Sequence, residues 1–177
     1  MEERTGEAYE LGEQSTVVGK KLQPGDTAPA FALDSFDGEA MQTIQLADSA
    51  GSVRLLNVVN SLDTPVCHVE TRRWEAMRGD LPEQVQVYTI SMDLPFAQAR
   101  WQSAENVTHH ALSSHRDEQF GRDYGVLIKE WRLLQRAVFV IDASNRITYA
   151  EYVADQMLEP DYAATIAAAR RAVGKDA

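Results

Sequence analysis

Residues 53–67 read VRLLNVVNSLDTPVC, and this stretch decides the fold. Its first seven residues are nearly continuous in apolar side chains, which is typical of a strand buried on both faces of a parallel sheet. Pro65 then suits the first turn of a helix, where the N–H that proline lacks would have no partner. A buried strand that leads directly into a helix begins a strand–helix–strand unit, so we expect an α/β fold.

The same alternation continues on both sides of this stretch. Apolar runs predict strands at residues 30–33, 41–46, 85–91, 107–112, 137–142 and 147–153, with a turn at 35–38 and an antiparallel hairpin turn at 143–145. Helices are expected at residues 65–78, 95–105, 116–124 and 160–173. The polar residues 1–25, with Gly12, Gly19 and Gly25 between short apolar groups, suit an N-terminal β-hairpin or arm. We therefore predict a three-layer α/β fold of thioredoxin-like type that forms one domain over residues 1–177.

The composition argues against several classes of partner and site. The formal net charge of −10 repels nucleic acid, and no apolar run reaches the roughly 18 residues of a membrane span. The acidic first residues are unlike a secretory signal, so export is not expected. A single cysteine excludes an internal disulfide and a cysteine-rich zinc site, and it suits the reducing cytoplasm. We expect a cytoplasmic protein that binds neither nucleic acid nor membranes.

That cysteine, Cys67, stands at the start of the predicted helix. With Thr64 as the N-cap residue and Pro65 as the first helical residue, Cys67 is the third, and its backbone N–H has no partner within the helix. The positive end of the helix dipole and the free N–H groups favour a thiolate at such a position. The alternative interpretation is that Cys67 is a small buried apolar residue.

A thiolate that acts as a nucleophile is held in its ionised form when a cation lies beside it. Arg136 is the best candidate, because it directly precedes the strand predicted at residues 137–142, and a neighbouring parallel strand could bring it near the helix start. The alternative is that Arg136 is a solvated charge at a strand end. The histidines His68, His109, His110 and His115 show no metal-binding spacing, so no metal site is expected.

Several segments are similar to the thiol peroxidase branch of the peroxiredoxins: SLDTPVC (61–67), TRRW (71–74), VYTISMDLPFAQARW (87–101), HRD (115–117) and YGVLIKEWRLLQRAVFVID (124–142). The resemblance implies a thioredoxin-like fold of the peroxiredoxin type, no metal or organic cofactor, and a homodimer. It also implies that Cys67 is the peroxidatic cysteine, that Thr64 orients the peroxide through its hydroxyl, and that Arg136 activates the thiolate.

Two positions depart from that family pattern. The family begins its active-site loop with a proline, where this chain has Asn60, and it places a resolving cysteine after the arginine and aromatic residue of the second helix, where this chain has Gln102. The loop at residues 103–110 is also slightly shorter than usual. Without a second cysteine no intramolecular disulfide can form. We therefore predict a one-cysteine mechanism, in which Cys67 reduces hydrogen peroxide and organic hydroperoxides and an external thiol, a thioredoxin-like protein or a small thiol, reduces the resulting sulfenic acid.

Two other functions remain open at this point. One is a redox sensor or adaptor, in which oxidised Cys67 forms a mixed disulfide with a partner protein. The other is a thioredoxin-fold domain whose catalysis is weakened, which Asn60 and Gln102 together would permit. The presence of Thr64, Cys67 and Arg136 in one chain favours the peroxidase.

Overall fold

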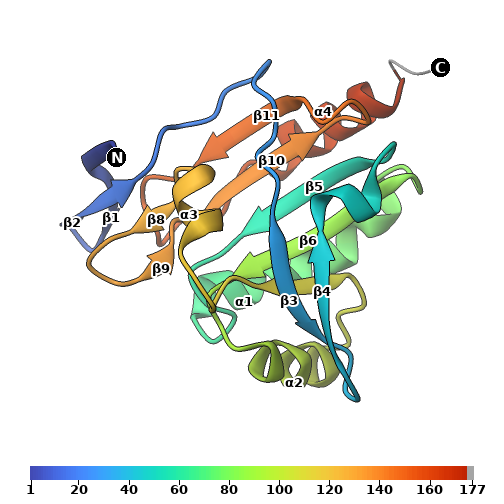
Figure 1. Ribbon diagram of the computed structural model, residues 1–177, viewed down its shortest axis with the longest axis horizontal. Coiled ribbons are helices and arrows are strands. Elements are labelled where there is room, and N and C mark those ends of the chain that lie inside the picture. The colour runs from blue at the N-terminus through green and yellow to red at the C-terminus, as the bar shows by residue number, and fades with distance from the viewer. Residues whose placement is uncertain (175–177) are drawn as a thin grey trace.

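The centre of the molecule is a mixed sheet with seven strands, seen in the computed structural model, which describes residues 1–174 (Figure 1). Its order is β11-β10-β5-β6-β7-β3-β4. The strands are β3 (Ala32–Phe36), β4 (Met41–Gln45), β5 (Val53–Val58), β6 (Val85–Ser91), β7 (His110–Ser113), β10 (Ala137–Ile141) and β11 (Ile147–Tyr152). β5, β6 and β7 run parallel, and the remaining pairs are antiparallel.

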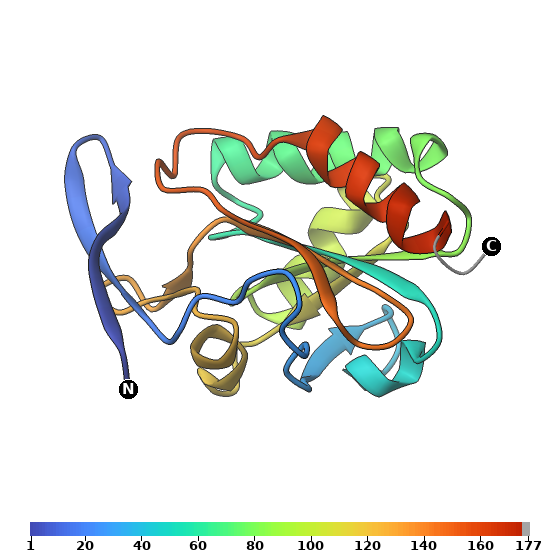
Figure 2. The same cartoon turned by 90° about the horizontal axis from the view of Figure 1, so that it is seen from above.

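Helices cover both faces of this sheet (Figure 2). α1 (Pro65–Ala76) and α4 (Tyr162–Gly174) lie on one face, and the short α3 (Gln119–Asp123) lies on the other. Successive side chains of β5 point to opposite faces of the sheet. Leu55 belongs to the apolar cluster under α1 and α4, and Leu56 belongs to the cluster under α3. α2 (Pro95–Glu105) packs against β7 and β3. This confirms the thioredoxin-like three-layer arrangement.

The N-terminal segment forms the expected hairpin. β1 (Glu3–Glu10) and β2 (Glu13–Val18) pair antiparallel, and the residues between them, Leu11 and Gly12, have φ values of 50° and 87°, as a type I′ turn requires. β2 also pairs with β8 (Leu127–Ile128), and β8 pairs with β9 (Leu133–Leu134). These four strands form a second sheet with the order β1-β2-β8-β9. The hairpin stands at one side of the molecule, next to the segment that precedes β10 (Figures 1 and 2).

Element boundaries agree closely with expectation in the middle of the chain. β6 and α2 have the predicted bounds, whereas α1 ends at Ala76 and gives way to a 3₁₀ turn, η2 (Met77–Asp80). β3 starts two residues later than predicted, which moves its turn to residues 37–40. The strand expected at 107–112 begins only at His110, because Asn106 ends α2 in the left-handed conformation with φ 55° and the chain then needs three residues to return to the sheet. α3 and α4 are also shorter at their starts than predicted, and the 3₁₀ turn η1 (Leu46–Ser49) follows β4.

One prediction about strand direction is wrong. β10 pairs with β5 in antiparallel, not parallel, orientation, and Ala137 lies opposite Val58. The first residue of β10 therefore faces the last residue of β5, where the chain turns toward α1. Arg136 reaches the helix start for this reason, because a parallel neighbour would have placed its own first residue at the opposite end of β5.

Candidate active site

The candidate nucleophile lies in the first turn of α1, as predicted. Thr64 is the N-cap residue, with φ −85° and ψ 144°, and the first helical backbone bond runs from the N–H of His68 to the carbonyl of Thr64, 2.9 Å apart. The N–H of Cys67 precedes this bond, so it belongs to the free donors of the helix start. The Thr64 hydroxyl does not cap the helix and instead donates to the carbonyl of Ser61 at 2.8 Å.

Cys67 is completely buried and still contacts two polar groups. It packs in a cluster with Val59, Leu62 and Trp101. Its Sγ accepts a hydrogen bond from Arg136 Nη1 at 3.3 Å, and its S–H can donate to Asn60 Oδ1 at 3.8 Å. The interpretation of Cys67 as a merely apolar buried residue therefore fails, because a guanidinium is aimed at its sulfur.

Arg136 is held rigidly at this position and is not a solvated strand-end charge. Its side chain is 1% exposed, Nη2 donates to the Gln156 carbonyl at 2.8 Å, and Nη1 also donates to the carboxylate of Glu70. The side chain of Gln156 accepts from the backbone N–H of Arg136 at 2.9 Å. Gln156 was missed in the sequence because it lies in an irregular segment after β11 and carries no motif.

Glu70 was also missed, although its position offered a signal. It follows Cys67 by three residues on α1, which places both side chains on one face of the helix. Its carboxyl is fully buried, one oxygen bonds Arg136, and the other, Oε1, has no partner among the described residues. Burial raises the pKa of Glu70 to about 8, even though the Arg136 guanidinium acts in the opposite direction. The carboxyl and the thiol therefore share one cationic nitrogen.

The active-site loop is fixed by polar side chains, among them Asn60, at the position where the sequence resemblance led us to expect a proline. Asn60 is buried, and its amide donates to the carbonyl of Leu134 and to Gln156 Oε1, the latter at 3.1 Å. From the other side, the carboxylate of Asp93 accepts from the Ser61 hydroxyl at 2.6 Å and from the N–H of Leu62 at 2.8 Å. Hydrogen bonds thus constrain the segment that leads to Cys67.

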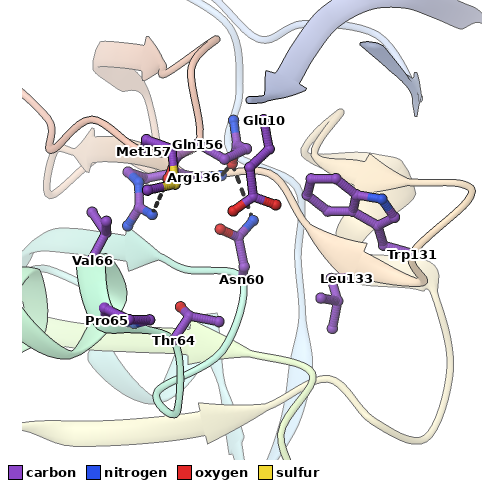
Figure 3. A pocket seen from close by; sticks show the side chains of 10 residues that line it. All are labelled: Glu10, Asn60, Thr64, Pro65, Val66, Trp131, Leu133, Arg136, Gln156 and Met157. Carbon is purple, nitrogen blue, oxygen red and sulfur yellow. Dashed lines mark hydrogen bonds between the residues drawn. The ribbon is translucent and has the colours of Figure 1, made fainter. Parts of the chain in front are cut away.

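A cavity of about 180 Å³ opens beside this arrangement (Figure 3). Its polar lining includes Asn60, Thr64 and Arg136, and its apolar lining consists of Pro65, Val66, Trp131, Leu133 and Met157. Thr64 and Arg136 thus face one cavity, and Cys67 is bonded to the Arg136 guanidinium that borders it. Two of the three predicted residues, Thr64 and Arg136, therefore line a space that fits a small molecule, and the third, Cys67, lies buried behind Arg136 without lining it.

Gln102, at the position where the resemblance led us to expect a resolving cysteine, contributes to packing. Its side chain donates to the carbonyl of His109 at 2.6 Å, which ties α2 to the start of β7. The neighbouring Trp101 donates from Nε1 to His68 Nδ1 at 3.1 Å, so α2 also holds the first turn of α1. Any opening of the first turn of α1 would have to break this second contact.

The part of the chain that the structure describes contains no group of three or more His, Cys, Asp or Glu side chains that could hold a metal. His109 is instead buried between Glu75 and Thr89, at 2.6 and 2.8 Å, and His115 contacts Asp34 at 3.0 Å. Over residues 1–174, no helix is both long and apolar enough to cross a membrane.

Comparisons with known proteins identify the family of the chain. Residues 24–150 match the AhpC/TSA family. The thiol peroxidase of Streptococcus sanguinis is 48% identical over 161 residues, which cover 90% of this chain and 96% of that protein. The thiol peroxidase of Bacillus subtilis (strain 168) is 44% identical over 159 residues, covering 89% and 93%.

Solved structures with a similar fold come from the same group of proteins. A peroxiredoxin-like protein from Aquifex aeolicus has a TM-score of 0.81 at 33% identity, with 96% of this chain and 97% of that chain covered. The thiol peroxidase from Chromobacterium violaceum shares the fold, with a TM-score of 0.80 at 24% identity and coverage of 96% and 98%. The chain therefore belongs to the AhpC/TSA family, in the thiol peroxidase branch of the peroxiredoxins, and carries one cysteine.

Proposed function

We propose that this chain is a thiol-dependent peroxidase that reduces hydrogen peroxide and organic hydroperoxides through a sulfenic acid on Cys67. The observation that carries the proposal is the 3.3 Å contact between Arg136 Nη1 and Cys67 Sγ at the start of α1, beside a cavity. A buried sulfur that meets a guanidinium and the free N–H groups of a helix start is favoured as a thiolate, and the thiolate is the nucleophile.

The reaction needs no group beyond the chain and its substrates. The Cys67 thiolate attacks the terminal oxygen of ROOH, an S–O bond forms, and the O–O bond breaks. The pair of electrons leaves with RO⁻, which takes up a proton to give ROH or water, and the sulfur is oxidised to sulfenic acid. Arg136 and the helix N–H groups stabilise the charge that develops on the oxygens.

Thr64 is the residue that we assign to orienting the peroxide. Its hydroxyl hydrogen is committed to the carbonyl of Ser61, at 2.8 Å, so its oxygen is left as an acceptor. Because Thr64 lines the cavity next to Arg136, that acceptor is available to the O–H of a bound hydroperoxide. The peroxide would then be held by one acceptor from Thr64 and by the donors of Arg136.

Reduction of the sulfenic acid requires an external thiol, because the chain contains one cysteine. The thiol condenses with the sulfenic acid, releases water and leaves a mixed disulfide, which a second thiol reduces. A thioredoxin-like protein, a glutaredoxin-like protein or a small cellular thiol could serve. Because Cys67 is fully buried, the first turn of α1 must open to admit any of them.

The same proposal includes the setting in which the enzyme acts. We infer a cytoplasmic homodimer of single-domain subunits in which the N-terminal hairpin is part of the domain. An unpaired thiol that must stay reduced supports the cytoplasm, and the family resemblance supports the dimer. Light scattering of the purified protein tests the dimer directly.

Multiple-turnover consumption of peroxide tests the activity. Wild type and Cys67→Ser are supplied with dithiothreitol and either hydrogen peroxide or cumene hydroperoxide. We expect continuous consumption by wild type above the dithiothreitol background and none by the variant. Consumption of a single equivalent per chain, despite excess reductant, would instead support a redox sensor, and no consumption would support a domain with weakened catalysis.

A further inference from the structure

The mechanism leaves one charged side chain of the cavity unused. Glu10 is the last residue of β1, on the N-terminal hairpin, and it is half-buried. Its carboxylate points into the cavity toward Asn60, with Trp131 beside it (Figure 3). The hairpin thus supplies an acidic group to a site whose other polar residues come from the central sheet and α1.

The charge of Glu10 is not offset within the cavity. Two side chains that line it carry a charge at neutral pH, Glu10 and Arg136. The Arg136 guanidinium is already bonded to Glu70 and to Cys67 Sγ, and the thiolate form of Cys67, the proposed nucleophile, offsets its positive charge. Over residues 1–174, the Glu10 carboxylate takes part in none of the ion pairs. An incoming substrate therefore meets an unpaired carboxylate.

The walls of the cavity strengthen the electrostatic effect of the Glu10 carboxylate. Pro65, Val66, Leu133, Trp131 and Met157 form an apolar lining, which suits an alkyl or aryl substituent and has a low dielectric constant. Low-dielectric walls focus the field of a charge that lies between them. An anionic group on the substituent of a hydroperoxide would enter this field, whereas a neutral substituent would not respond to it.

Building on the proposed peroxidase function, we infer that Glu10 makes the cavity selective for uncharged hydroperoxides and rejects hydroperoxides whose substituent carries an anionic group. Two like charges separated by about 8 Å at an effective dielectric constant near 20 change a rate or affinity by on the order of tenfold or more. A cationic substituent should show the opposite preference.

The test compares three hydroperoxides that share the cumyl skeleton and differ in the charge of the para substituent. Cumene hydroperoxide is neutral, its para-carboxylate is anionic, and its para-trimethylammonium derivative is cationic. Second-order rates of Cys67 oxidation are measured for wild type, Glu10→Gln and the control Glu39→Gln, which removes an exposed carboxylate from the turn between β3 and β4, away from the cavity. The quantity compared is the rate with each charged substrate divided by the rate with the neutral one.

We expect Glu10→Gln to raise the anionic-to-neutral ratio by about tenfold at low salt and to lower the cationic-to-neutral ratio, while Glu39→Gln keeps both ratios of wild type. Opposite shifts for the two charges cannot arise from general damage to the fold. Ratios that stay unchanged in Glu10→Gln, or that move together, would overturn the inference. Hydrogen peroxide is run in parallel: if it too fails to oxidise wild type, the proposed function fails, whereas a normal rate with unchanged ratios refutes only the role of Glu10.

Discussion

Replacing Glu70 by glutamine should make Cys67 form its thiolate at lower pH. The Glu70 carboxylate and Cys67 Sγ both accept from Arg136 Nη1, the sulfur at 3.3 Å. When Glu70 is ionised, a thiolate becomes a second buried anion on one guanidinium, which opposes its formation. Glutamine has nearly the same shape and can still accept from Arg136, but it carries no charge.

The size of the effect follows from this shared nitrogen. Two atoms that each bond the same nitrogen lie at most about 6 Å apart. Two unit charges at this separation repel by about 3 kcal/mol at an effective dielectric constant near 20. This repulsion corresponds to a shift of about 2 pH units in the midpoint of a titration. The pKa of Glu70 is raised to about 8, so near that pH part of the carboxyl is protonated and carries no charge. We therefore expect the midpoint of thiolate formation to fall by about 1 to 2 pH units in Glu70→Gln.

The assay is a pH titration of thiolate absorbance near 240 nm, with Cys67→Ser as the blank. Glu105→Gln is the matched control, because Glu105 contacts His68 and Arg72 across α1 and α2 but does not contact Arg136. Its midpoint should equal that of wild type. A midpoint in Glu70→Gln that is unchanged, or that moves to higher pH, would refute the reasoning and show that Glu70 acts by holding Arg136 in place.

Four further results are expected from the same site. Arg136→Met should slow oxidation of Cys67 by on the order of 100-fold, since a preorganised donor is lost, and Thr64→Val should slow it less, by about tenfold; stopped-flow rates that match wild type would remove either residue from the mechanism. Excess peroxide without a reductant should convert Cys67 to the sulfinic acid, visible in the intact mass, because no second thiol can trap the sulfenic acid. Gln102→Cys should form a disulfide with Cys67 after one turnover and protect it from this overoxidation; peptide mapping that finds a free introduced thiol beside a sulfinic Cys67 would show that α2 does not unwind.

Local patterns in the sequence predicted most of the fold. The bounds of α2 follow from Pro95 at its first position and from Asn106, which ends the helix in the left-handed conformation. The position of Cys67 in the first turn of α1 follows in the same way from Pro65. The direction of β10 could not be predicted, because an apolar run such as Val-Phe-Val-Ile is equally suited to a parallel or an antiparallel neighbour.

The candidate site was harder to predict because its contacts are distant in the chain. Arg136 was proposed from its place before a strand and from the family resemblance, and it contacts Glu70 across 66 residues, which no local pattern encodes. In the sequence, Asn60 stood out only because it occupies the position where the resemblance led us to expect a proline. In the structure its buried amide bonds the Leu134 carbonyl and Gln156, so it fixes the loop by another means.

The central claim is that this arrangement makes Cys67 a fast nucleophile toward peroxide, and the second-order rate constant of its oxidation by hydrogen peroxide tests it most directly. Trp101 packs in the same cluster as Cys67, so stopped-flow tryptophan fluorescence can follow the reaction. We predict a rate constant at least about a thousandfold above that of a free thiol at the same pH, since positioned donors alone contribute 10²–10³ and the thiolate fraction adds to it. A rate no faster than that of a free thiol would contradict the account.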